Sequence, residues 1–129
     1  MSVMKLDHFT VNVTNGLADS ERFYEDVLGL KKQELVDMGD HEIRYFELWD
    51  TKLELIHYKY DTEKITCPVD SRGIYRHMAL LTDDLNGLYE RLKEYDVEVT
   101  MKPSWCENLK FHNMLFKDPN GVEIEVVER

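Results

Sequence analysis

The sequence is poor in cysteine and in basic residues, and each shortage excludes a class of protein. Its 129 residues include two cysteines, Cys67 and Cys106, which are too few for a disulfide framework and favour a cytoplasmic protein with free thiols. The sequence has 16 Lys and Arg residues but 26 Asp and Glu residues, so the formal net charge is −10. Nucleic acids and anionic membranes attract basic surfaces, and neither is an expected partner of this chain.

Long hydrophobic runs are also missing. No apolar run approaches the length of about 18 residues that suggests a transmembrane helix, and the first residues lack the apolar core of a secretory signal. The composition is 43% hydrophobic and 11% aromatic, with three prolines, which is typical of a globular domain. A chain of this length buries enough surface to fold as one domain without disulfide bonds.

Two segments have the apolar spacing of an amphipathic helix. The first covers residues 17–28, and Gly29 follows it at the position where a glycine commonly ends a helix. The second covers residues 85–95, and Asp83 or Asp84 is its expected N-cap.

Most of the remaining chain alternates between apolar and polar residues, as β-strands do. An Asp-Pro-Asn-Gly turn at residues 118–121 separates the last two expected strands. The eight expected strands cover residues 6–13, 31–36, 42–48, 52–58, 75–81, 97–101, 110–116 and 122–127.

The order of these elements repeats once along the chain. A βαβββ module over residues 1–60 is followed by a loop, 61–72, and a second βαβββ module over residues 73–129. The predicted fold class is therefore α+β, with the two modules pairing into a cupped mixed β-sheet and the helices outside. Aligning the modules places His8 on His77 and Glu54 on Glu125.

The aligned residues share one face of their strands. Because side chains alternate across a strand, His8, Glu54, His77 and Glu125 all point away from the helices. Two carboxylates balance the charge of a divalent cation, and two neutral imidazoles complete a ligand set suited to Ni, Zn, Co, Mn or Fe. The pattern predicts a metal site, with Glu123 as an alternative to Glu125 because it lies on the same face.

The segments that carry these residues resemble the vicinal oxygen chelate superfamily, which includes glyoxalase I, extradiol dioxygenases, methylmalonyl-CoA epimerase, and fosfomycin- and bleomycin-resistance proteins. The resemblance implies a single glyoxalase-like domain over residues 1–129, and it matches Glu125 rather than Glu123 to the ligand. Because Glu54 is present, the chain most closely resembles glyoxalase I, which uses a His-Glu-His-Glu ligand set. The matching segments are LDHFTVNV with ERFYEDVLGL, TKLELIHY, IYRHMALLTDDL and DPNGVEIEVVE.

The resemblance to glyoxalase I implies a metal-dependent lyase or isomerase. Such an enzyme converts the hemithioacetal of methylglyoxal and a thiol, glutathione or another, through a metal-bound enediolate. Glu125 would be the catalytic base and Glu54 its partner, in a homodimer that binds a small-molecule substrate. Candidate substrate contacts, which need the strand register to be placed, include Trp105, Phe111, His112 and Met114.

Two alternatives stay open within the superfamily. One is another metalloenzyme: an epimerase, an extradiol dioxygenase or a thiol transferase. The other is a metal-free small-molecule-binding protein that resembles the bleomycin-resistance proteins. The metal content of the purified protein separates the second alternative from the enzymes.

Overall fold

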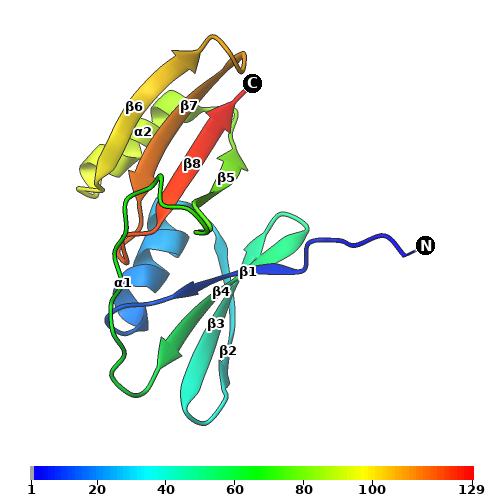
Figure 1. Ribbon diagram of the computed structural model, residues 1–129, viewed down its shortest axis with the longest axis vertical. Coiled ribbons are helices and arrows are strands. Elements are labelled where there is room, and N and C mark those ends of the chain that lie inside the picture. Colours follow the sequence, from blue (N-terminus) through cyan, green and yellow to red (C-terminus); the bar gives the residue numbers. More distant parts are fainter. Residues whose placement is uncertain (1) are drawn as a thin grey trace. The chain divides into compact units, whose positions relative to one another are not determined.

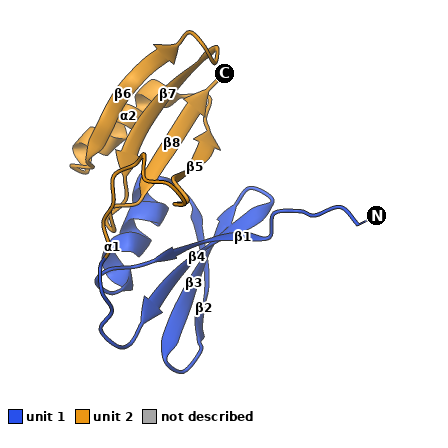
Figure 2. Cartoon of the chain, in the orientation of Figure 1, with its two compact units in different colours: residues 1–64 blue, residues 65–129 orange. Residues whose placement is uncertain are grey.

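The computed structural model describes residues 2–129, which divide into two compact units between Lys64 and Ile65 (Figure 2). Each unit contains one four-stranded sheet with its helical segment on one side (Figure 1). The α+β fold class and the two βαβββ modules predicted from the sequence are confirmed.

Unit 1 has the sheet order β1-β4-β3-β2. Strand β1 runs parallel to β4, and the other neighbours are antiparallel, so the sheet is mixed. Its elements are β1 (His8–Asn12), the α-helix α1 (Leu17–Arg22), the π-helix η1 (Phe23–Val27), β2 (Lys31–Asp37), β3 (His41–Leu48) and β4 (Thr51–Tyr58).

Unit 2 repeats this topology with the sheet order β5-β8-β7-β6. Strand β5 runs parallel to β8, as β1 does to β4. Its elements are β5 (His77–Leu81), α2 (Leu85–Glu94), β6 (Val99–Cys106), β7 (Phe111–Lys117) and β8 (Glu123–Glu128). None of the helices formed by residues 2–129 has the length and apolar character needed to cross a membrane.

The core of each unit lies between its sheet and its helical segment. In unit 1, Leu53 and Leu55 of β4 are fully buried on the helix side of the sheet. In unit 2, Ile124 and Val126 of β8 occupy the corresponding positions, with Leu92 of α2 also fully buried. The opposite face of each sheet carries Glu54 and Glu125 together with apolar residues such as Ile43 and Val127.

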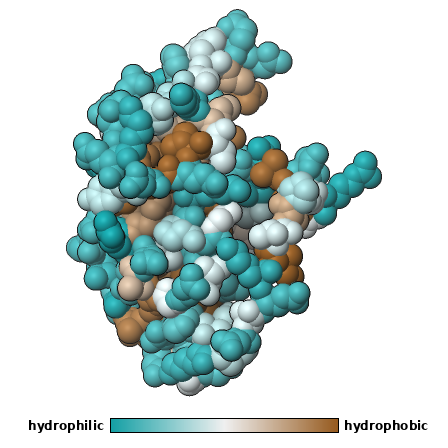
Figure 3. Space-filling model, turned by 90° about the vertical axis from the view of Figure 1, so that its left-hand side faces the viewer, coloured by the Kyte–Doolittle hydropathy of each residue, from teal (hydrophilic) through white to brown (hydrophobic). Residues whose placement is uncertain are grey.

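The face shown in Figure 3 is mainly hydrophilic, with hydrophobic side chains in scattered patches. Both cysteines are free, as predicted, with Cys67 exposed and Cys106 partly buried.

The first helix differs from the prediction of one regular helix over residues 17–28. Its second half is a π-helix, in which the amide of Leu28 donates to the carbonyl of Phe23 over 3.1 Å. Phe23 and Tyr24 are adjacent in sequence and both buried, and their rings pack edge to face with centroids 5.0 Å apart. Gly29 follows with φ of 71°, the left-handed conformation expected of a helix-ending glycine.

Strand β6 is longer than predicted. It continues beyond Met101 through Pro103 to Cys106. A proline ordinarily interrupts a strand because it lacks an amide hydrogen, but β6 lies at the edge of its sheet, where the missing donor is tolerated. The pairing with β7 is irregular between Met101 and Ser104, next to this proline.

The start of α2 provides a test of local stability. The carboxylate of Asp84 accepts a hydrogen bond from the amide of Gly87 over 2.9 Å, which makes Asp84 the N-cap. Replacing Asp84 with alanine should lower the free energy of unfolding by about 1 kcal/mol, because the cap is lost. Urea unfolding of Asp84→Ala beside Asp83→Ala measures this, since the control removes the neighbouring charge and keeps the cap. Equal losses in the two variants would contradict the assignment.

Candidate metal centre

Unit 1 brings two of the predicted ligands together. The parallel pairing of β1 with β4 sets Thr10 opposite Glu54 and His8 opposite Lys52, two residues away. The side chains of His8 and Glu54 meet on the sheet face opposite the helix, with Nε2 of His8 2.9 Å from Oε2 of Glu54. We call this pair half-site 1.

Neighbouring groups orient both members of half-site 1. Nδ1 of His8 lies 2.7 Å from Oδ2 of Asp7, and Oγ1 of Thr10 donates to Oε2 of Glu54 over 2.7 Å. Tyr45, opposite Glu54 on β3, forms a hydrogen bond to the same carboxylate. Only 7% of the surface of Glu54 is exposed, but several hydrogen-bond donors surround its carboxylate.

The same contacts shift two pKa values in half-site 1. The hydrogen bond to Asp7 raises the pKa of His8 and outweighs the opposing effect of burial, while the charge of Glu54 acts in the same direction as Asp7. The pKa of Tyr45 is raised by its hydrogen bond to Glu54 and by burial. In both cases the largest cause is a hydrogen bond to a carboxylate, Asp7 for His8 and Glu54 for Tyr45.

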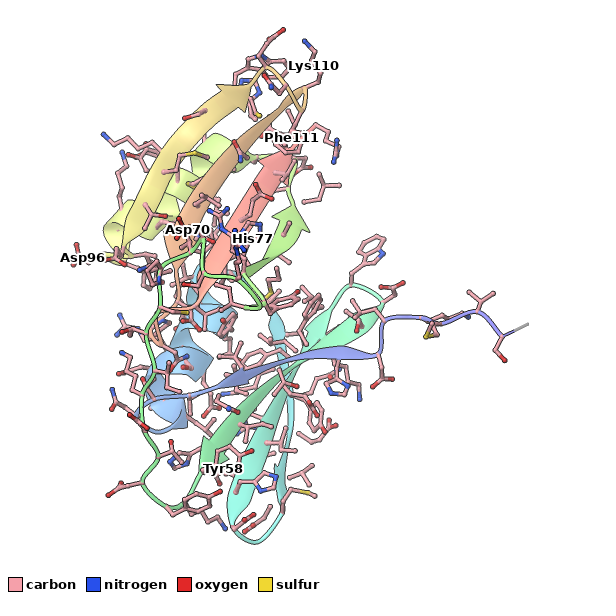
Figure 4. The ribbon with its side chains drawn as sticks, viewed as in Figure 1. Tyr58, Asp70, His77, Asp96, Lys110 and Phe111 are labelled. Carbon is pink, nitrogen blue, oxygen red and sulfur yellow. The ribbon has the colours of Figure 1, made fainter. Side chains whose placement is uncertain are left out.

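Unit 2 repeats the pair. Strand β5 sets Ala79 opposite Glu125 and His77 opposite Glu123, so His77 and Glu125 have the same register relation as His8 and Glu54. Nε2 of His77 lies 3.5 Å from Oε1 of Glu125. We call His77 and Glu125 half-site 2, and Figure 4 labels His77 on β5 next to β8.

Glu125 has one further partner in unit 2. Nδ2 of Asn113, on β7, donates to Oε2 of Glu125 over 2.9 Å. Because the side chain of Glu125 is 17% exposed and that of Glu54 10%, both are largely removed from water.

Glu123, the alternative ligand considered from the sequence, has different partners. Its Oε2 lies 3.0 Å from Nδ1 of His77, and Arg76 donates to both of its oxygens, from Nε over 2.8 Å and from Nη2 over 3.3 Å. Burial favours a higher pKa for Glu123, but the hydrogen bonds from Arg76 and His77 outweigh it and lower the pKa. Thus Glu123 contacts one ring nitrogen of His77, and Glu125 faces the other.

Both half-sites share one arrangement that suits a metal ion. In each, one carboxylate contacts Nδ1 of the histidine and another faces Nε2. When Nδ1–H donates to a carboxylate, the lone pair of Nε2 is free to bind a cation, which is how metal-binding histidines are commonly oriented. One imidazole and one carboxylate in each half-site form a nitrogen–oxygen donor set that fits Ni, Zn, Co, Mn or Fe.

Each unit alone supplies two of the four predicted ligands. Within residues 2–129 there is no group of three or more His, Cys, Asp or Glu side chains that could hold a metal ion. A common centre formed by His8, Glu54, His77 and Glu125 therefore stays a prediction.

The strand register shows which side the expected substrate contacts take, and it adds Asn113, which the sequence did not reveal. Phe111 lies two residues before Asn113, so it shares the face of Glu125, where it is buried. His112 and Met114 alternate with Asn113, so they lie on the opposite face, and Met114 is fully buried. Trp105 is paired with His112, and their rings are in contact with centroids 5.0 Å apart and planes tilted by 59°. Asn113 was missed because only the pairing of β7 with β8 shows which side it takes.

Comparison with known proteins places the chain in a family. A duplicated βαβββ module with a His–Glu pair on each sheet defines an α+β protein with two matching half-sites. Residues 5–126 match the model of the Glyoxalase/Bleomycin resistance protein/Dioxygenase superfamily. The chain belongs to this superfamily.

Solved structures share the fold at low sequence identity. A glyoxylase/bleomycin resistance protein/dioxygenase domain from Frankia sp. is 18% identical, with a TM-score of 0.82 and 98% of each chain covered. The fosfomycin resistance protein FosX from Listeria monocytogenes is 14% identical, with a TM-score of 0.72, and the match covers 99% of this chain and 93% of that one. A glyoxalase I mutant from Zea mays is 18% identical, with a TM-score of 0.74, and the match covers 95% of this chain and 43% of that one. A search of curated protein sequences gives no match.

Proposed function

We propose that this protein is a metal-dependent lyase or isomerase of the glyoxalase I type. Its substrate would be the hemithioacetal of a small 2-oxoaldehyde, such as methylglyoxal, with glutathione or another thiol. The observation that carries the proposal is the His–Glu pair in each unit, because dioxygenases and thiol transferases of this superfamily ordinarily lack the ligand that Glu54 would supply.

The metal ion would be held by His8, Glu54, His77 and Glu125. Each unit offers two of these ligands, so one ion needs half-site 1 and half-site 2 together. We propose that they meet in a homodimer, half-site 1 of one chain with half-site 2 of the other, as the resemblance to glyoxalase I suggests. A bound divalent ion would stabilise the negative charge that develops on a substrate oxygen.

The side chains around the centre would move a proton between two adjacent carbons of the substrate. Glu125 is the better candidate for the base: the neutral amide of Asn113 donates to one of its oxygens, and His77 lies 3.5 Å from the other. Glu54 is held more firmly, by Thr10, by Tyr45 and by His8 at 2.9 Å. A carboxylate that must move during turnover should form few hydrogen bonds, because each bond resists the movement.

Metal content and activity test the proposal together. Protein stripped with a chelator should have no activity and should recover it when a suitable divalent ion is restored, with methylglyoxal and several thiols tried in turn. His8→Ala should bind the ion more weakly, whereas His57→Ala should not, because His57 is paired with Glu42 at 3.1 Å, outside half-site 1.

The other outcomes identify the alternatives. If the purified protein binds none of the five ions, it is not a metalloenzyme of this type, and a metal-free small-molecule-binding protein is favoured. If it binds an ion without converting any hemithioacetal but consumes oxygen with catechols and ferrous iron, it is a dioxygenase. Both results would contradict the glyoxalase I assignment.

A further inference from the structure

We propose that Arg76 and Glu123 form a clamp that holds His77 in place to bind the metal ion, and that half-site 1 has no equivalent. Half-site 2 is then the preorganised half of the centre, and Glu123 is a positioning residue that acts through His77. The effect of the clamp on metal binding rests on the proposed function, but the state of the His77 ring can be observed without any metal.

The clamp is defined by three hydrogen-bonding contacts and by burial. The guanidinium of Arg76 donates to both oxygens of Glu123, over 2.8 and 3.3 Å, so it fixes the plane of the carboxylate. Oε2 of Glu123 then lies 3.0 Å from Nδ1 of His77. Only 8% of the Glu123 side chain is exposed, so little water competes for these bonds.

The clamp determines which nitrogen of His77 is available. A fixed carboxylate at Nδ1 favours the ring form that carries its hydrogen there, which leaves the lone pair on Nε2. That nitrogen faces Glu125, the second ligand of half-site 2. Glu123 therefore contributes to metal binding without being a ligand itself.

Half-site 1 provides a natural comparison. Asp7 contacts Nδ1 of His8 at 2.7 Å, in the place that Glu123 takes in half-site 2. However, its side chain is 94% exposed, and within residues 2–129 no lysine or arginine forms an ion pair with it. An exposed carboxylate holds its partner weakly because water competes for the same bonds. The two histidines thus differ in support, although their ligand geometry is similar.

The first measurement compares metal affinity across three variants. Competition of the chelator-stripped protein with a metal-binding dye, using Zn²⁺ and Ni²⁺, gives the dissociation constant. Glu123→Gln should weaken binding by roughly 10–100-fold, the usual effect of losing such a supporting carboxylate. Arg76→Gln should weaken it in the same direction, and Asp7→Asn, the matched change in half-site 1, should have a smaller effect than either. Equal losses for Glu123→Gln and Asp7→Asn would overturn the proposal.

The second measurement records the ¹⁵N signals of the histidine rings in metal-free protein in alkaline solution. The wild-type protein should show His77 with its hydrogen on Nδ1, and Glu123→Gln should lose this preference while circular dichroism shows an unchanged fold. A ring form that is the same in both proteins would overturn the clamp. If the clamp signature is present and the wild-type protein binds no metal, the proposed function fails while the clamp stands.

Discussion

Replacing Glu125 with glutamine is expected to lower turnover by about 10²–10⁴-fold, the usual contribution of a general base. The substitution removes the proton-accepting carboxylate but keeps a side-chain oxygen to accept the hydrogen bond from Asn113. The fold should therefore be unchanged. The measurement is the rate constant for turnover at saturating metal, with the bound metal quantified in the same sample, so that lost catalysis is distinguished from lost metal.

Glu54→Gln is the matched control, because Glu54 occupies the corresponding place in half-site 1. Its carboxylate receives hydrogen bonds from Thr10 and Tyr45, so it is fixed rather than free to move. We expect this variant to bind the metal more weakly and to regain much of its turnover when the ion is added in excess. The reverse pattern, with Glu125→Gln active and Glu54→Gln inactive while metal is bound, would assign the base to Glu54.

The topology of both units could be predicted because local patterns agree with the tertiary structure. In β4 the alternation of Leu53, Glu54 and Leu55 shows which side chains pack on the helix, and burial of both leucines confirms it. The end of β6 could not be predicted in this way. Pro103 signals a break in an isolated sequence, and only the position of the strand at the sheet edge explains why the pairing continues.

The two His–Glu pairs were predictable for a different reason, the duplication of the chain. Aligning the modules selects His8 with Glu54 and His77 with Glu125, and the strand pairing gives both pairs the same register. The supporting residues were not predictable. Glu123 and Glu125 share a face in the sequence pattern, and what distinguishes them is Arg76, which precedes β5 and reaches Glu123 only in the folded chain.

Mixing two inactive variants is expected to restore part of the activity, which tests whether each metal centre is shared between two chains. His8→Ala disables half-site 1, and His77→Ala disables half-site 2. In a mixed dimer with shared centres, one centre combines both defects and the other combines two intact half-sites. Random pairing of equal amounts makes half of the dimers mixed, so about a quarter of the wild-type activity should return.

Refolding the two variants together from denaturant, or producing them in the same cells, allows the chains to exchange. Light scattering of the mixture verifies that dimers form, and each variant alone provides the baseline. A mixture of His8→Ala with Glu54→Ala is the decisive control. Both changes fall in half-site 1, so every centre retains a defect and no activity should return, whichever chains contribute to a centre.

The proposed arrangement would be contradicted if dimers form but the mixture of His8→Ala and His77→Ala stays at the baseline. Centres contained within one chain give that result, because each chain then carries its own defect into its own centre. Recovery therefore requires more than dimerisation: half-site 1 and half-site 2 must come from different chains. Since each unit supplies one histidine and one glutamate, a shared centre makes the complete ligand set, and with it the activity, depend on dimer formation.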